Sequence, residues 1–185
     1  MKKWIFLLLL FPLTCVAQTY QYLGVEDGLS NRRVYCIQKD RTGYMWFLTH
    51  EGIDRYNGKD FKRYKLMDGD TEVNSLLNLN WLYIDRDGVL WEIGKKGKIF
   101  RYDEIHDRFE LVYKLPIENF RDLPAPVSFA WLDRNNHIWL CNEETIFLYN
   151  TATAQVCPIR NEIKEEITDI EQIDESHYFI GTEMG

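Results

Sequence analysis

Residues 40–46 read Asp-Arg-Thr-Gly-Tyr-Met-Trp, and the pattern returns as Asp-Arg-Asp-Gly-Val-Leu-Trp at 85–91 and as Asp-Arg-Asn-Asn-His-Ile-Trp at 133–139. A fourth copy, one residue shorter, reads Asp-Glu-Ser-His-Tyr-Phe at 174–179. The aromatic residues that end the copies are spaced 45, 48 and 40 residues apart. Repeats of this period are typical of β-propellers, in which each repeat forms one four-stranded blade. The sequence therefore predicts an all-β fold of propeller blades.

The chemistry of the repeat fits a hairpin turn followed by a buried strand. In the first copy, Asp40 is expected to accept hydrogen bonds from backbone N–H groups of the turn, and Gly43 to supply the positive φ angle that the turn requires. Asn136 replaces this glycine in the third copy, and asparagine tolerates the same conformation. In the first and third copies the tryptophan has apolar neighbours on both sides, which indicates a strand buried on both faces. We therefore assign the tryptophans, and Phe179 in the fourth copy, to packing between blades.

Each repeat divides into four expected strands, from the innermost to the outermost. The predicted strands are 34–40, 44–50, 53–56 and 60–66, then 77–85, 89–94, 98–102 and 108–113, then 127–133, 137–142, 146–149 and 155–160. The blades then cover residues 31–66, 76–113 and 127–160, with a truncated fourth blade at 167–185. The prediction is an incomplete arc of about three and a half blades.

The N-terminus has the features of a secretory signal peptide over residues 1–17. Two lysines precede an apolar stretch at 4–13, and small residues at 15 and 17 suit a cleavage site before Gln18. A lipoprotein anchor at Cys15 is the alternative. Export places the mature chain in an oxidising compartment, and its three cysteines, Cys36, Cys141 and Cys157, allow at most one disulfide among them. The alternative, which fits equally well, is that the three cysteines form no disulfide and act as small buried hydrophobic side chains.

Composition and charge exclude several classes of protein. The aromatic content of 15% excludes a disordered chain. The formal net charge of −7 argues against binding to a phosphate backbone. Only one apolar run exists, so the chain is not a multi-span membrane protein.

A resemblance to a known family rests on a longer stretch around the first copy. Residues 22–31 read Tyr-Leu-Gly-Val-Glu-Asp-Gly-Leu-Ser-Asn, and residues 52–58 read Gly-Ile-Asp-Arg-Tyr-Asn-Gly. With the turn and tryptophan between them, they resemble the two-component regulator propeller repeat. In the fourth copy, 179–185 resembles that family's Trp-Ile-Gly-Thr-x-x-Gly segment, from which the first three copies depart.

The resemblance implies the N-terminal periplasmic sensor region of a hybrid two-component receptor. Such receptors carry propellers, a membrane helix and a histidine kinase, and many detect oligosaccharides. By analogy we expect an oligosaccharide ligand and contact with the rest of the receptor, which would form a homodimer when intact. We also expect the intact receptor to be anchored in the inner membrane and to carry a histidine kinase that this chain lacks. Residues 20–23 are expected to form the outer strand that closes the last blade of the ring.

The length also predicts how the chain behaves. A propeller generally needs at least four blades to close, and repeat units bury their faces only against their neighbours. We expect the chain to be a natural short product or a truncated reading frame of a longer receptor. We also expect residues 18–185 alone to be poorly soluble or oligomeric, because exposed edges and apolar faces promote association.

Ligand-binding candidates are few. Tyr83 and Trp131 occupy one place on the innermost strands, two residues before the turn aspartate, and sugar sites favour exposed aromatic side chains. They are the candidate ligand-binding residues, against the alternative that they pack in the core.

No catalytic residue, metal ligand or cofactor is predicted. The four histidines are scattered, and the stretch 68–72 is assigned to an acidic turn rather than to a calcium loop. Glu143 and Glu144 are adjacent, so on a strand they would point to opposite faces and form no catalytic pair. Two alternatives to a sensor stay open, a propeller scaffold for protein–protein interaction and a propeller glycosidase or lyase.

Overall fold

The computed structural model describes residues 20–73, 79–115 and 127–185, so the predicted signal peptide lies outside the described residues. One short 3-10 helix, η1 (Val25–Asp27), precedes the strands. Every other described element is a strand.

Four antiparallel sheets follow one another along the chain. The first sheet contains β1 (Val34–Lys39), β2 (Met45–Thr49), β3 (Gly52–Tyr56) and β4 (Phe61–Tyr64). The second contains β7 (Leu79–Ile84), β8 (Leu90–Gly94), β9 (Lys98–Asp103) and β10 (Arg108–Lys114). The third contains β11 (Phe129–Leu132), β12 (His137–Cys141), β13 (Thr145–Asn150) and β14 (Val156–Arg160). The fourth pairs β15 (Ile167–Gln172) with β16 (Tyr178–Thr182).

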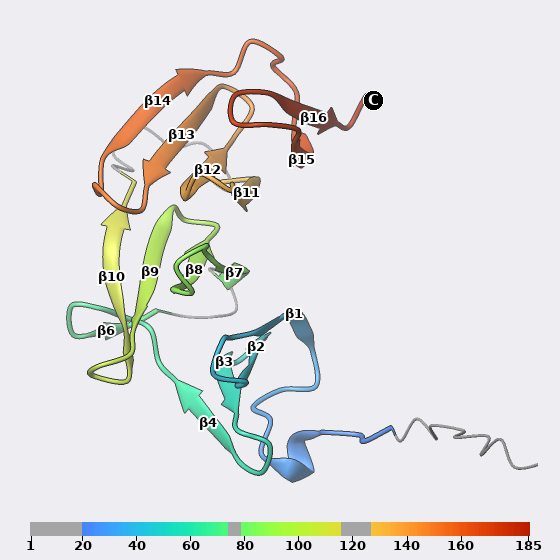
Figure 1. The fold of residues 1–185 in the computed structure, drawn as a ribbon, viewed down its shortest axis with the longest axis vertical. Coiled ribbons are helices and arrows are strands. Elements are labelled where there is room, and N and C mark those ends of the chain that lie inside the picture. The colour runs from blue at the N-terminus through green and yellow to red at the C-terminus, as the bar shows by residue number, and fades with distance from the viewer. Residues whose placement is uncertain (1–19, 74–78, 116–126) are drawn as a thin grey trace, which may run out of the picture.

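The sheets stand side by side in an open arc (Figure 1). Strands β1, β7, β11 and β15 line its concave side, and β4, β10 and β14 form its outer rim. The predicted all-β arc of three four-stranded blades and a partial fourth is confirmed, and the strand boundaries fall within about two residues of those expected.

Two local predictions come out differently. The stretch 68–72, expected to be an acidic turn, belongs to an additional hairpin of β5 (Met67–Asp68) with β6 (Thr71–Glu72). Asp68 accepts hydrogen bonds from Lys98 at 2.7 Å and Lys114 at 3.1 Å, and these bonds lower the pKa of its carboxyl. Residues 20–23 are not assigned to a strand, and their closing role stays a prediction.

The turn aspartate of each complete copy binds both the turn and the tryptophan. The Oδ1 atom of Asp85 accepts the backbone N–H groups of Asp87 at 2.9 Å and Val89 at 2.8 Å. Its Oδ2 atom accepts the indole N–H of Trp91 at 2.8 Å. The same indole bond joins Trp46 to its turn aspartate at 2.7 Å and Trp139 to its own at 3.1 Å. The backbone bonds confirm the expected turn, and the indole bonds add a contact that the sequence analysis did not anticipate.

The turn also requires one residue with a positive φ angle. Gly43 and Gly88 adopt φ angles of 96° and 89°, and Asn136 adopts 62° in the third copy. Asparagine is one of the few residues with a side chain that accept this conformation. The predicted substitution of asparagine for glycine is thus confirmed.

Each tryptophan packs against the sheet that follows its own. We call this side of a sheet its forward face, and the opposite side its backward face. Trp46 is 1% exposed and meets Tyr102 and Phe109 of the second sheet at ring distances of 4.7 and 6.0 Å. Trp91 and Trp139 are 3% and 7% exposed within the next two junctions. Packing between blades is therefore confirmed as the role of the three tryptophans.

One junction holds a buried acid. Glu92 lies on β8 beside Leu82 and Phe100, which belong to the core between the first two sheets. It is 0% exposed, and both of its carboxylate oxygens are without a hydrogen-bond partner. Burial raises the pKa of this carboxyl well above its usual value, because the charged form cannot be solvated there.

Asp85→Ala is expected to destabilise the chain by about 3 kcal/mol, because two backbone N–H groups and a buried indole N–H lose their acceptor. Urea denaturation measures the change. Asp60→Ala is the control at an exposed position and should change the free energy of unfolding by less than about 0.5 kcal/mol. Equal effects of the two substitutions would contradict the role assigned to the hydrogen bonds of Asp85.

Glu92→Leu is expected to raise the free energy of unfolding at pH 7 by about 2 kcal/mol, because an unpaired buried acid is replaced by an apolar side chain. The folded chain holds the Glu92 proton more tightly than the unfolded chain, whose pKa is near the usual 4.5. The contribution of Glu92 to stability should therefore be greatest below that pH and fall as the pH rises above it. Denaturation at several pH values should show a smaller fall for Glu92→Leu, whereas an identical pH profile would rule out a buried neutral carboxyl.

Candidate functional site

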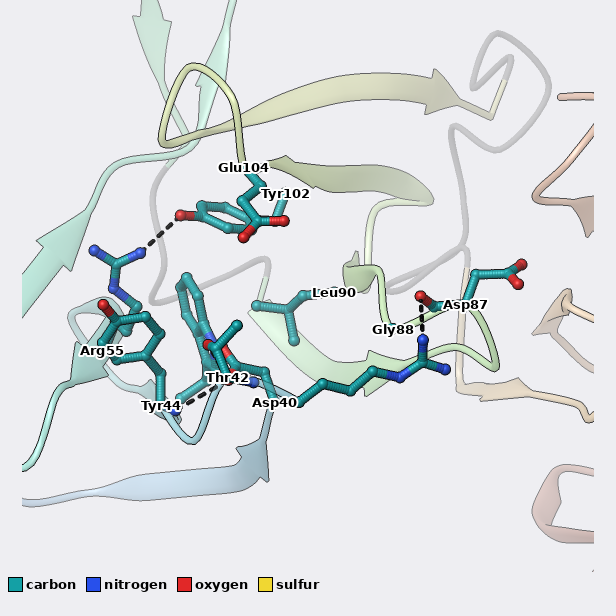
Figure 2. A pocket seen from close by; sticks show the side chains of 11 residues that line it. Asp40, Thr42, Tyr44, Arg55, Asp87, Gly88, Leu90, Tyr102 and Glu104 are labelled. Carbon is teal, nitrogen blue, oxygen red and sulfur yellow. Dashed lines mark hydrogen bonds between the residues drawn. The ribbon is translucent and has the colours of Figure 1, made fainter.

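The junction of the first two sheets contains a hollow of about 160 Å³ at its turn end (Figure 2). Aromatic, acidic and basic side chains surround it. The first sheet and its β1–β2 turn contribute Asp40, Arg41, Thr42, Tyr44, Trp46 and Arg55. The second sheet and its turns contribute Asp87, Gly88, Leu90, Tyr102 and Glu104.

Arg41 forms one wall by crossing from the first sheet to the second. Its guanidinium donates to the backbone carbonyl oxygen of Asp87 at 2.8 Å and to that of Arg86. It passes directly over Gly88, where a Cβ atom would lie 2.9 Å from the Arg41 side chain. The glycine therefore serves both the turn, through its positive φ angle, and the close approach of the arginine.

A hydrogen-bonded network behind the hollow holds its other wall. Asp107, in the β9–β10 turn, accepts the hydroxyl groups of Tyr64 and Tyr102 at 2.6 Å each, and pairs with Arg55 at 3.2 Å and with Lys62. Burial alone would raise the pKa of this carboxyl, but the hydrogen bonds from Lys62 and the two tyrosines outweigh it and hold the pKa well below its usual value. The network ties the outer strands of the two sheets together.

Arg55 is the residue that joins this network to the hollow. Its guanidinium donates to the hydroxyl of Tyr102 at 2.8 Å and lies 4.5 Å from the centre of the Tyr44 ring. Cation–π contacts of this kind add to the hydrogen bonds when the arginine is shielded from water, and this side chain is only 18% exposed. The walls are therefore held by the protein itself, and Glu104 lies at the rim. The Asp87 carboxylate instead accepts the side-chain amide of Asn136, from the third sheet, at 2.9 Å.

The two predicted ligand residues lie in sheet junctions away from this hollow. The Tyr83 hydroxyl donates to the backbone carbonyl oxygen of Ala130 at 2.9 Å. Burial raises the pKa of that hydroxyl. Trp131 meets Trp139 and Tyr178 at ring distances of 6.2 Å. Both side chains are half-buried, and the structure does not bring them together with the residues of the hollow. Their role in ligand binding stays a prediction.

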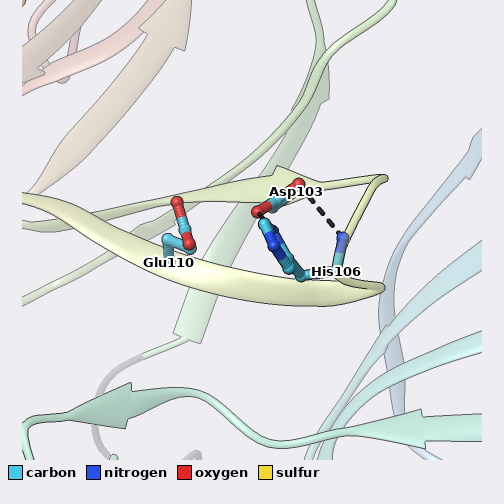
Figure 3. A group of neighbouring side chains, drawn as sticks. All are labelled: Asp103, His106 and Glu110. Atoms are coloured by element: carbon cyan, nitrogen blue, oxygen red, sulfur yellow. Dashed lines mark hydrogen bonds and ion pairs between the residues drawn. The ribbon is translucent and has the colours of Figure 1, made fainter.

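Among the described residues, one group of metal-ligating side chains lies close together (Figure 3). Donor atoms of Asp103, His106 and Glu110 are all within 4.8 Å of one another on the β9–β10 hairpin. Glu110 already accepts hydrogen bonds from Arg108 at 2.8 Å and Arg101 at 3.5 Å. Two neighbouring guanidinium groups disfavour a cation at this carboxylate. The group is therefore better explained as an ion-pair cluster that stiffens the hairpin.

The other histidines occupy turns or edges. His137 and His177 each contact the aspartate of their own turn, at 3.3 and 2.9 Å. Their side chains are 32% and 72% exposed. The Nδ1 atom of His50 and the hydroxyl oxygen of Tyr35 share a hydrogen bond of 2.8 Å.

The three described cysteines are free, with Cys36 half-buried, Cys141 buried and Cys157 exposed. Burial raises the pKa of the Cys141 thiol to about 12, so this cysteine is inert as a nucleophile. Within residues 20–73, 79–115 and 127–185, no helix has the length and apolar character needed to cross a membrane.

Glu143 and Glu144 are not on a strand, in agreement with the predicted strands at 137–142 and 146–149. They form the bend between β12 and β13, and both line a polar hollow of about 530 Å³ with Arg160 and Lys164. Strand alternation therefore does not separate them. Because basic side chains line the same hollow, it carries surface charges of both signs.

The sequence analysis missed the residues that build the walls of the first hollow. The turn and Trp46 were recognised from the repeat, but the crossing of Arg41 was not. A signal existed, because arginine follows the turn aspartate in all three complete copies. Arg86 repeats the crossing and donates to the backbone carbonyl oxygen of Arg134 at 2.9 Å.

Comparisons with known proteins agree with this architecture. The chain is similar to the extracellular domain of a protein from B. thetaiotaomicron described as a hybrid two component system, with 22% identity and a TM-score of 0.66. It is also similar to such a domain of a one component system from that organism, with 18% identity and a TM-score of 0.66. Each alignment covers 88% of this chain, which spans 24% and 21% of the two domains.

An enzyme shares the fold as well. The virginiamycin B lyase of Staphylococcus aureus, solved as an inactive variant with quinupristin, has 18% identity and a TM-score of 0.60. The alignment covers 82% of this chain and 50% of the lyase. At such identities the three similarities establish the propeller fold and do not separate sensing from catalysis.

Sequence comparison adds a match to one family over a short stretch of the chain. No curated protein sequence matches the chain significantly. The family model described as "Two component regulator propeller" matches residues 28–51, which include the first turn and its tryptophan. The resemblance inferred from the sequence is thus confirmed: residues 28–51 match the model of the two-component regulator propeller repeat, within a chain that has a propeller fold.

Proposed function

We propose that this chain is a ligand-sensing propeller module on the periplasmic side of a hybrid two-component receptor. The match of residues 28–51 to the regulator propeller repeat supports this assignment, as does the similarity to an extracellular domain of such a system. In this proposal, a membrane-anchored receptor with a histidine kinase carries the signal onward. The chain itself binds the ligand and performs no chemistry.

We place the ligand at the hollow between the first two sheets. The observation that carries this placement is that the matched repeat supplies five of the lining residues, Asp40, Arg41, Thr42, Tyr44 and Trp46. Loops and turns held by a rigid scaffold are where propellers and other β folds bind their ligands. A ligand here would contact both sheets and thereby favour one arrangement of the junction over others.

The chemistry of the hollow fits the end of an oligosaccharide. Glu104 can accept hydrogen bonds from sugar hydroxyl groups, and the Arg41 guanidinium can donate to ring and hydroxyl oxygens. The tyrosine rings offer apolar surface to sugar C–H groups. A volume of about 160 Å³ is below the range of roughly 300–1,000 Å³ that holds a drug-sized ligand. We therefore expect one terminal sugar unit to enter, with the rest of the chain outside.

Glu104→Ala is expected to weaken oligosaccharide binding at least about tenfold, the effect of losing one hydrogen bond to a charged acceptor. Isothermal titration calorimetry of the full chain against a panel of oligosaccharides measures this affinity. Glu162→Ala removes the same charge at a side chain that is 78% exposed and far from the hollow, and should bind as the wild type does. Equal affinity of Glu104→Ala and the wild type would exclude this hollow as the site.

Tyr83→Phe and Trp131→Phe separate the hollow from the two residues first predicted to bind ligand. Tyr83→Phe should lower the free energy of unfolding by about 1 kcal/mol, because the carbonyl oxygen of Ala130 loses its donor. Both variants should bind the oligosaccharide with unchanged affinity if the hollow is the site. A loss of affinity with normal folding would instead move the site to the concave side of the arc.

A further inference from the structure

Asn136 carries a side chain at a turn position where the first two copies have glycine. Gly43 and Gly88 hold the same position, and all three residues have a positive φ angle. Glycine would satisfy this conformation in the third copy as well. The conformation of its own turn therefore does not require the amide of Asn136, and the contacts of that amide point to a second role.

The Asn136 amide extends backward, from the third sheet to the turn of the second. Its Nδ2 atom donates to Oδ2 of Asp87 at 2.9 Å, and its Oδ1 atom accepts the backbone N–H of Arg86 at 3.3 Å. An ionised carboxylate only accepts and a backbone N–H only donates, so the two partners fix which way the amide points. A hydrogen bond to an ionised acceptor is roughly twice as strong as one between neutral groups. One side chain thus binds two adjacent residues of the turn 85–88.

The backbone of Asn136 is held by its own sheet. Its carbonyl oxygen accepts the backbone N–H of Thr151 at 3.0 Å and the Thr151 hydroxyl at 2.9 Å. Its N–H donates to the carbonyl oxygen of Asp133 at 3.2 Å. The amide therefore extends from a fixed backbone, and its short side chain has few torsions to order. The contact with the turn 85–88 is a link between two sheets.

The crossing arginines explain why the second copy has glycine at this position and the third does not. Arg41 extends forward directly over Gly88, where a Cβ atom would lie 2.9 Å from the arginine. Arg41 donates to two backbone carbonyl oxygens of the turn 85–88. Arg86 makes one such bond to the next turn, with the carbonyl oxygen of Arg134 at 2.9 Å. The shorter reach of Arg86 leaves space for a side chain at Asn136.

The turn 85–88 is therefore held from both sides. From the first sheet, Arg41 donates to its carbonyl oxygens, as Figure 2 shows for Asp87. From the third sheet, Asn136 binds its N–H and carboxylate groups. Asp87 and Gly88 of this turn line the hollow together with Arg41. A shift of the turn would move the carbonyl oxygens that hold Arg41, so this wall depends on a residue that does not line the hollow.

We propose that Asn136 is a positioning residue for the hollow, because it fixes the turn 85–88 to which Arg41 is bonded, and that it thereby couples occupancy of the hollow to the third sheet. The coupling rests on the proposed function, since it requires a ligand in the hollow. It is also reciprocal: the factor by which the Asn136 contact strengthens ligand binding is the factor by which a bound ligand strengthens the contact.

The first experiment measures hydrogen exchange at the backbone N–H of Arg86 in the full chain without ligand. Asn136→Gly keeps the turn conformation and removes the amide. Exchange at Arg86 should become about tenfold faster, the effect of losing one hydrogen bond. Asn135→Ala is the matched control, because this amide belongs to the same turn but donates to the carbonyl oxygen of Glu175 at 3.0 Å. It should leave exchange at Arg86 unchanged.

An interchange of the two polar groups separates the contact from a general loosening of the third turn. Asn136→Asp keeps an acceptor for the Arg86 N–H but places a second carboxylate beside Asp87, so exchange at Arg86 should become faster. Adding Asp87→Asn restores an amide donor facing an ionised acceptor, with the two groups interchanged. The double variant should return exchange at Arg86 toward the wild-type rate. Circular dichroism reports whether each variant folds.

The second experiment measures affinity by isothermal titration calorimetry, with the tightest binder among maltotriose, xylotriose and mannotriose. Asn136→Gly should weaken binding at least about fivefold, and Asn135→Ala should bind as the wild type does. A saturating concentration of the same trisaccharide should slow exchange at Arg86 in the wild type by the same factor. It should leave that exchange unchanged in Asn136→Gly, which has no amide to couple.

Two outcomes would overturn the proposal. One is the same exchange rate at Arg86 in Asn136→Gly and in the wild type. The other is faster exchange in Asn136→Gly together with wild-type affinity, while Glu104→Ala binds more weakly. Wild-type affinity of both variants, or no binding of the three trisaccharides by the wild type, contradicts the proposed site instead. The exchange rates at Arg86 then still decide whether Asn136 holds the turn.

Discussion

The bond between the turn aspartate and the indole of the tryptophan six residues later is the constraint on which this architecture depends. One carboxylate fixes the hairpin through backbone N–H groups and fixes the tryptophan through its ring nitrogen. The tryptophan then presents its ring to the following sheet with its only polar atom already satisfied. Local turn and packing between sheets are therefore set by the same side chain. In the fourth copy the aspartate is shifted by one position and the indole is replaced by Phe179, so this link is absent there.

The candidate site also results from the repeat, because the repeat fixes where the turns of successive sheets lie. Turns of successive sheets lie next to one another, and the space left between two of them becomes the hollow lined by Arg41 and Glu104. Its walls are rigid because Asp107 collects hydroxyl and cationic groups from both sheets. Ligand contacts at such a junction are made by residues whose first role is to join the sheets. Because the same residues serve both roles, a bound ligand can change how the two sheets pack against each other.

The sequence was sufficient for the sheets, the turns and the burial of the tryptophans, because each of these is encoded within a few residues and repeated. Interactions between distant residues were beyond its reach. Asp107 is 43 and 52 residues from Tyr64 and Arg55, and nothing local marks their convergence. The hairpin of β5 and β6 was missed because two-residue strands have no periodicity to detect. Tyr83 and Trp131 were located at the right register, but register alone does not separate a ligand contact from a sheet junction.

Four of the bonds that cross from one sheet to the next share one property. Those of Gln38, Tyr83, Arg41 and Arg86 each end on a backbone carbonyl oxygen of the following sheet. An acceptor of that kind is present whatever side chain the residue carries. A repeat can thus change the side chains at these four acceptor positions without losing the bonds from the repeat before it. Sequence divergence between copies at these positions therefore costs little stability. New binding residues can accumulate in one blade while these bonds continue to join it to its neighbours.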